Sequence, residues 1–146
     1  MIDDPTAQYM IEAQPRFEDL RQTIAQLAGV LVLTASGAQS PAAEPALSAS
    51  AVLLEESVDG LRALRVPARA RRHHDHLAAA AGTIGRALVL ARHSSAHRRD
   101  GSAVDAALAC LREGYRQLEE AGRTLPGFEM VAFDVACCAG HARSPR

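Results

Sequence analysis

An apolar stripe runs unbroken from Met10 to Thr34, with members three or four positions apart, and limits this chain to folds in which helices pack side by side. The spacing places all of these side chains on one face of an α-helix. A single helix cannot hide such a face from water, so the stripe requires partner helices. Its members are Met10, Ala13, Phe17, Leu20, Ile24, Leu27, Leu31 and Thr34.

Three later segments repeat the same spacing. We expect a second helix over about Leu47–Val66, where Pro67 ends it, and a third over about Ala68–His97. A fourth helix starts at Ser102 and stops before Pro126. Their stripes are Leu47, Ala51, Leu54, Val58 and Leu61; Ala70, His73, Leu77, Ala80, Ile84, Ala87, Ala91 and Ser94; and Val104, Leu108, Leu111, Tyr115, Leu118, Gly122 and Leu125. Such stripes can shelter one another in an all-α, four-helix up-and-down bundle with a short packed C-terminal segment.

The composition fits a core of small and aliphatic side chains. Hydrophobic residues make up 48% of the 146 residues, but aromatic residues only 3%. Strong helix formers dominate, whereas the β-branched and aromatic residues that favour strands are sparse. A chain of this length can bury about 68–70% of its unfolded surface, so we expect residues 1–146 to form a single helical-bundle domain.

Three local signals mark the ends and breaks of the helices. The segment Ser36–Pro45 combines Gly, Ser and two prolines with almost no large apolar residue and predicts a linker between the first two helices. Asp4 followed by Pro5 is typical of an N-cap with proline at the first helical position. Pro15 lies inside the first stripe and removes a backbone donor, so we predict a kink or a restart there.

The segment Phe128–His141 admits two interpretations. Phe128, Val131, Val135 and Cys138 fit a short helix, while Val131, Phe133 and Val135 alternate as in a strand. We favour a short helix or a packed extended segment. Because two of the chain's phenylalanines lie here, we expect the segment to cover an end or a side of the bundle. We expect only Arg143–Arg146 to form a disordered tail.

Charge and cysteine content limit the location and the partners. The formal net charge is −1 and every basic residue is Arg, so no field of one sign points to nucleic acid. The start of the chain, with Asp3 and Asp4, does not fit a signal peptide, and no apolar run reaches the roughly 18 residues of a membrane span. Three cysteines are too few for a disulfide framework. We therefore expect a cytoplasmic protein without nucleic-acid or membrane partners.

Two groups of side chains suggest a metal site. Cys137, Cys138 and His141 combine thiols with an imidazole, which can bind a transition metal such as zinc or take part in redox chemistry. His73 and His76 lie on neighbouring faces of the third helix and can chelate an ion. If the C-terminal segment folds back, the two groups meet. The alternative is that His73 belongs to the core, His76 is solvated and the cysteines are small buried apolar residues.

The third helix also resembles a known family. The run from Asp75 to Gly85, with its small residues and glycines, is similar to the helix of histidine-containing phosphotransfer domains, which are helical bundles. Asp75 stands where that family has its phosphorylated His, Ala78 where it has Lys, and Ala79 where it has Gly. The resemblance therefore implies a degenerate phosphotransfer-like bundle, in which His74 or His76 would have to substitute.

Glycines inside the helical stripes are a further signal. Each costs roughly 1 kcal/mol relative to alanine in a helix, so something should compensate. Close contact between helices is one explanation, and a groove for a ligand or a partner helix is the other. These glycines are Gly29, Gly60, Gly82, Gly85, Gly114 and Gly122.

Motifs typical of enzymes are missing from the sequence. It has no Gly-rich phosphate loop, no Gly-x-Ser-x-Gly elbow and no His-Glu-x-x-His helix. We expect a non-enzymatic protein that binds itself, another protein or a small ligand. A metal-binding or thiol-redox protein that uses Cys137, Cys138 and His141 is the alternative. The long first stripe also predicts a homodimer, because it presents more apolar surface than three helices can cover.

Overall fold

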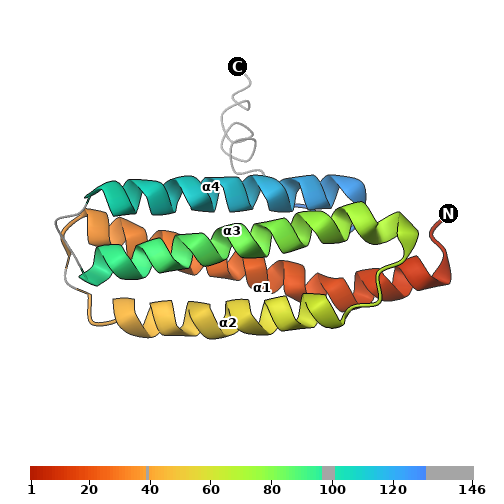
Figure 1. Ribbon diagram of the computed structural model, residues 1–146, viewed down its shortest axis with the longest axis horizontal. Helices are drawn as coiled ribbons and strands as arrows, with labels where there is room; N and C mark the ends of the chain where they lie inside the picture. Colours follow the sequence, from red (N-terminus) through yellow and green to blue (C-terminus); the bar gives the residue numbers. More distant parts are fainter. Residues whose placement is uncertain (39, 97–100, 131–146) are drawn as a thin grey trace, which may run out of the picture.

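The computed structural model describes residues 1–38, 40–96 and 101–130, and within these ranges it contains helices and no strand. The elements are α1 (Asp4–Ala35), α2 (Ala43–Ala63), a short 3₁₀ turn η1 (Ala68–Ala70), α3 (Arg71–Ala96) and α4 (Gly101–Thr124). The four α-helices lie side by side and alternate in direction (Figure 1). This confirms the predicted all-α, four-helix up-and-down bundle.

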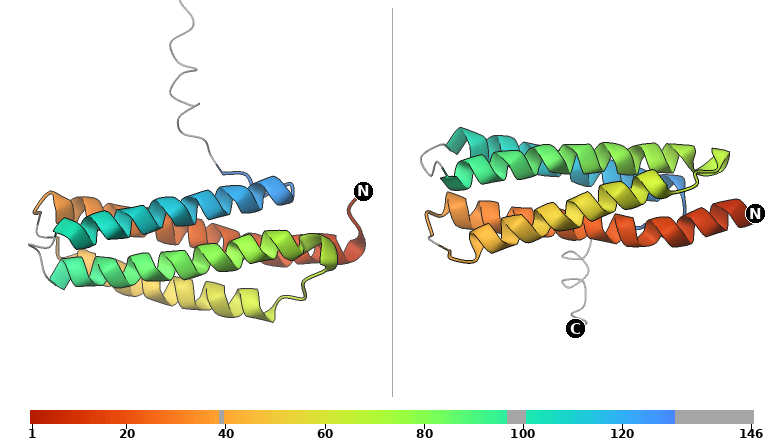
Figure 2. Two further views of the ribbon diagram at one scale, coloured as in Figure 1. Left: turned by 45° about the horizontal axis from the view of Figure 1, so that its top comes forward. Right: turned by 60° about the horizontal axis from the view of Figure 1, so that its bottom comes forward.

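The bundle consists of two helical hairpins that face each other. In the right-hand view of Figure 2, the α3–α4 pair lies on top of the α1–α2 pair. α3 makes its most extensive contact with α4, and α1 makes its most extensive contact with α2. α1 and α3 also pack against each other through the middle of the bundle. The apolar faces of all four helices therefore meet in one core.

The first helix begins with a side-chain cap and continues through its internal proline. Asp3, not Asp4, is the N-cap: its Oδ1 accepts a hydrogen bond of 2.9 Å from the backbone N–H of Thr6. The hydrogen bonds from Thr6 lower the pKa of the Asp3 carboxyl. α1 remains one helix through Pro15, so the predicted restart is wrong. Ala13 and Phe17, on either side of Pro15, are fully buried, and their packing holds the helix across the lost hydrogen bond.

The second helix lies earlier in the chain than predicted. It begins at Ala43, so the connection from α1 covers 36–42 and not the whole of Ser36–Pro45. Pro45 lies in the first turn of α2, where its missing N–H leaves no partner unsatisfied. α2 ends at Ala63, and Leu64 is extended with ψ 137°. The helix cannot reach the predicted Val66, because a residue that precedes proline disfavours the helical conformation.

The buried residues match the whole predicted stripe of α3 but only part of the predicted stripe of α4. Every member of the third stripe, from Ala70 to Ser94, is buried. In α4 the buried face is shifted by one position along part of the helix. The buried residues are Ala103, Val104, Ala107, Leu111, Gly114, Leu118 and Ala121, while the predicted Leu108, Tyr115 and Gly122 are half-buried. Small residues occupy the centre of this face because they allow α4 to lie close to α3.

Close packing explains two of the helical glycines. A Cβ atom on Gly114 would lie 3.1 Å from Ile84 Cγ1, and one on Gly122 would collide with the backbone carbonyl of Phe128. By contrast, a Cβ atom on Gly29 or Gly82 would have no neighbour within 4 Å. Packing within the described chain therefore does not explain the last two.

This contrast gives a stability prediction. We expect Gly29→Ala to raise the free energy of unfolding by about 0.5–1 kcal/mol, because alanine favours the helix and the site is open. Gly122→Ala should lower it by about 1–3 kcal/mol, because the new methyl group displaces Phe128. Urea unfolding followed by circular dichroism measures both. Equal stabilities for the two variants would show that Phe128 does not pack against α4 as described.

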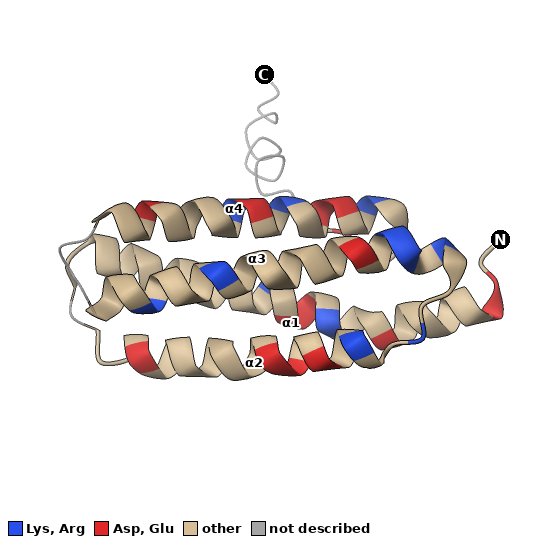
Figure 3. Cartoon of the chain, viewed as in Figure 1, with Lys and Arg blue, Asp and Glu red and all other residues tan. Residues whose placement is uncertain are grey.

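The surface of the bundle carries charges of both signs. Figure 3 shows acidic and basic residues interspersed along the helices. Several form ion pairs within one helix, such as Arg116 with Glu113 and Arg21 with Glu18, both at 2.6 Å. Exposed pairs of this kind contribute about 0–1 kcal/mol each. Among the described helices, none combines the length and the apolar character needed to cross a bilayer.

Candidate functional site

A buried aromatic cluster joins α1, α3 and the turn after α4. Tyr9 and Phe17 lie on the same face of α1, and His73 lies in the first turn of α3. Gly127 has φ +88°, which favours glycine, and the chain turns there so that Phe128 enters the core. The Phe128 ring centroid lies 4.2 Å from that of His73 and 5.4 Å from that of Phe17. All four side chains are at most 1% exposed.

Inside this cluster the Tyr9 hydroxyl lies 2.8 Å from Nδ1 of His73. Burial, together with the nearby His74 and His76, lowers the pKa of His73 to about 4. Burial, together with Asp75, raises the pKa of Tyr9 above its usual value. Both groups are therefore neutral at neutral pH and share one hydrogen bond, whose direction depends on which ring nitrogen of His73 carries the proton. Nε2 of His73 has no hydrogen-bond partner among the described residues. Burying an unsatisfied polar atom costs about 1–3 kcal/mol.

Of the predicted metal ligands, the structure describes the two histidines. His73 lies in the core beside Tyr9, whereas His76 is half-buried on α3. Cys137, Cys138 and His141 lie outside the described residues, so their meeting with either histidine stays a prediction. In the described part of the chain, no three His, Cys, Asp or Glu side chains are grouped so that they could hold an ion.

The residues that resemble a phosphotransfer helix lie along α3. Asp75, at the position of that family's phosphorylated histidine, is exposed. His74 and His76, which would have to substitute, are half-buried. Phosphotransfer by either histidine stays a prediction.

A groove between α2 and α3, which we call the α2–α3 groove, encloses about 400 Å³. Its walls come from the aliphatic face of α2, and its floor comes from small residues of α3. The lining consists of Leu54, Val58, Leu61, Arg62, His74, Ala78, Ala81, Gly82 and Gly85. At the apolar end of the groove, α2 and α3 lie close together, because a Cβ atom on Gly85 would be 3.7 Å from Leu54 Cδ2. The missing side chain of Gly82 leaves the middle of the floor open.

The other end of the α2–α3 groove is polar. α2 and α3 run in opposite directions, so Arg62 near the end of α2 and His74 near the start of α3 lie at the same end. The Arg62 guanidinium is 3.4 Å from Asp59, but both side chains are largely exposed, at 77% and 69%. Nδ1 of His74 is buried without a hydrogen-bond partner in the described chain, and burial lowers the pKa of this side chain. The groove therefore ends beside a cationic group and an unsatisfied imidazole nitrogen.

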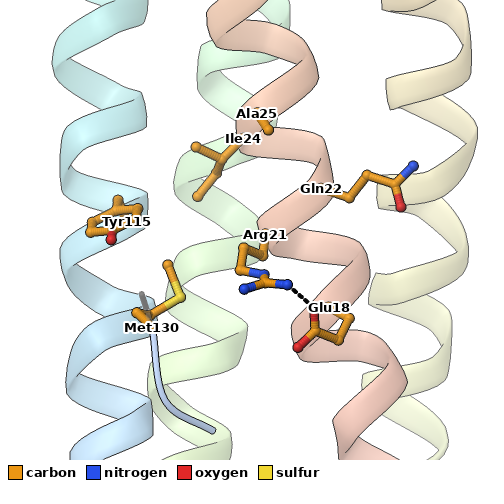
Figure 4. Close-up of a pocket in the computed structure, with 7 residues that line it drawn as sticks. All are labelled: Glu18, Arg21, Gln22, Ile24, Ala25, Tyr115 and Met130. Carbon is orange, nitrogen blue, oxygen red and sulfur yellow. Dashed lines mark ion pairs between the residues drawn. The ribbon is translucent and has the colours of Figure 1, made fainter. Parts of the chain in front are cut away.

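A second concavity, the α1–α4 hollow, encloses about 600 Å³. Figure 4 shows Ile24 pointing toward α4, with Tyr115 and Met130 on the opposite side and the Arg21–Glu18 ion pair at the edge. The hollow is lined by Glu18, Arg21, Gln22, Ile24, Ala25, Tyr115 and Met130. Met130 is the last residue before the undescribed end of the chain.

Sequence reasoning offered a groove as one explanation of the helical glycines but located neither concavity. Each is lined by residues from different helices, and periodicity within one helix does not show which neighbour a side chain faces. One signal was present, because Gly82 and Gly85 interrupt the third helix at a cost in helix stability. No family model, curated protein or solved structure matches this chain.

Proposed function

We propose that this is a non-enzymatic binding protein whose α2–α3 groove takes an apolar molecule with one anionic end. The observation that carries the proposal is the pairing of an open, glycine-floored apolar groove with a polar end formed by Arg62 and His74. The remaining lining residues are aliphatic or glycine, so the groove offers contacts and no nucleophile. Pockets for small ligands typically combine such an apolar lining with a few placed polar groups.

The cost of Gly82 to helix stability supports the proposal. A glycine inside a helix destabilises it by about 0.8–1 kcal/mol relative to alanine. Gly114 and Gly122 recover that cost by letting chain segments approach each other, but a Cβ atom on Gly82, like one on Gly29, would have no neighbour within 4 Å, and of these two open glycines only Gly82 lines the groove. A ligand in the groove would provide the missing contact.

The polar end supports an anionic group on the ligand. Arg62 is exposed and can leave its 3.4 Å contact with Asp59 at little cost. A ligand carboxylate there would accept hydrogen bonds from the exposed Arg62 guanidinium, beside the polar imidazole of His74. Along α3, the distance from His74 to Gly85 is about 16 Å at the helical rise per residue, which is long enough for a medium-length acyl chain.

The test is a titration with decanoate, followed by amide shifts in NMR spectra and by calorimetry. We expect saturable binding, with the shifts concentrated on Ala78–Gly85 and on the facing part of α2. Gly82→Gln should weaken binding about tenfold or more, because its side chain fills the groove. Gly29→Gln is the matched control, since it replaces another open helical glycine far from the groove and should bind as the parent does.

Two further comparisons decide what the groove recognises. Arg62→Gln should weaken binding of decanoate but not of decanol, which lacks the charge. Absence of saturable decanoate binding, or equal affinity in Gly82→Gln and Gly29→Gln, would overturn the proposal. Sedimentation equilibrium covers the predicted homodimer: a dimer that Gly82→Gln weakens, without decanoate binding, would make the groove a self-association surface and the ligand assignment wrong.

A further inference from the structure

We propose that the α1–α4 hollow is a docking site for the residues directly after Met130, with Phe133 as the side chain that binds in it. The occupant is thus a segment of this chain, 131–135. This inference is independent of the proposed function, because the hollow and the α2–α3 groove share no lining residue.

The chemistry of the hollow suits an aromatic side chain. Ile24 and Ala25 form its α1 side, and the Tyr115 ring and the Met130 side chain form the opposite side (Figure 4). Tyr115 is half-buried and Ala25 is exposed, so both can accept a further contact. An aromatic ring placed here would contact an aliphatic side chain, a thioether and another ring, all of which are favourable partners.

The position of Met130 fixes which segment can fill the hollow. Met130 lines the hollow, and the sequence continues from it with Val131, Ala132 and Phe133. A chain spans at most about 3.6 Å per residue, so Phe133 lies within about 11 Å of Met130 in any conformation. A tether this short gives an effective concentration in the millimolar range or above, which a free partner in solution rarely matches.

The charge at the edge of the hollow is also compatible with this segment. Arg21 is the basic residue of the lining, and its guanidinium already contacts Glu18 at 2.6 Å. Asp134 follows Phe133 directly. Entry of Phe133 would therefore bring an additional carboxylate toward Arg21, where its charge is favourable.

The experiment uses the full chain with a spin label on Cys138, in a background carrying Cys110→Ala and Cys137→Ser. We expect paramagnetic broadening of the amides of Glu18–Ala25 and of those around Tyr115, and none on α2. Ala25→Asp places a charge in the hollow and should abolish this pattern. Ala79→Asp, at an exposed position of α3, is the matched control and should retain it.

Hydrogen exchange of residues 131–135 in the unlabelled chain is the second measurement. Exchange should be slow in the parent and in Ala79→Asp, and at least several-fold faster in Ala25→Asp and in Phe133→Ser. Circular dichroism confirms that each variant is folded. Broadening that is uniform over the bundle or centred on another face, or equal exchange in Ala25→Asp and Ala79→Asp, would overturn the proposal. Broadening that appears only at high concentration, between labelled and unlabelled chains, would assign the hollow to a second copy instead.

Discussion

Replacing Phe128 with alanine is expected to lower the free energy of unfolding by about 3–5 kcal/mol. The phenylalanine is 1% exposed and contacts Phe17 from α1 and His73 from α3, so its loss opens a cavity where three parts of the chain meet. Urea unfolding followed by circular dichroism measures the loss.

Two other variants provide comparisons for Phe128→Ala. Phe17→Ala removes the opposite side of the same contact and should cost a similar amount, whereas Val89→Ala changes a side chain that is 67% exposed and should cost less than about 0.5 kcal/mol. A Phe128→Ala variant no less stable than Val89→Ala would show that the C-terminal turn does not contribute to the core.

Acidification is expected to cost about 3 kcal/mol of stability between about pH 7 and about pH 4, through His73 alone. In the unfolded chain the imidazole takes up its proton near its ordinary pKa of about 6.5. In the folded chain burial lowers the pKa to about 4. Between these two pKa values the unfolded state binds more protons than the folded state. The contribution of His73 to the free energy of unfolding is therefore fully present above the upper pKa and is lost as the pH falls toward the lower one.

The measurement is the free energy of unfolding in urea at several pH values across this range. Carboxylates also titrate in acid, so the parent is compared with the double variant Tyr9→Phe/His73→Leu. That variant replaces both hydrogen-bonding partners with apolar groups and should retain stability at neutral pH while losing most of the slope. Leu77→Ala removes a neighbouring buried side chain and should be less stable with the slope unchanged. The same slope in the double variant would exclude His73 as the source.

The sequence pattern predicted the whole buried face of α3 but only part of that of α4. In α3, Leu77 and Ile84 anchor a stripe whose every member is buried. In α4 the prediction chose Leu108 and Tyr115, but Ala107 and Gly114 occupy the centre of the interface. Periodicity gives weight to large apolar residues, whereas a closely packed helix pair places its smallest residues at the contact. The direction of the α4 face therefore depended on α3, which the sequence pattern of α4 does not contain.

The candidate site was predictable only in its parts. The sequence singled out His73 and offered a core position as one interpretation, yet its partner Tyr9 lies 64 positions away and was not identified. His74 was named only in the resemblance to phosphotransfer domains, and Arg62 was not singled out. Their proximity at one end of the α2–α3 groove follows from the antiparallel packing of two helices.

From its sequence alone, this protein had to be a bundle of amphipathic helices, because periodic apolar faces can leave water only by packing against one another. Which glycines are covered and which remain open, and which residues of neighbouring helices form a groove, depended on how the helices are rotated about their axes. That rotation is determined by side-chain contacts between segments far apart in the chain, and these exist only in the folded molecule.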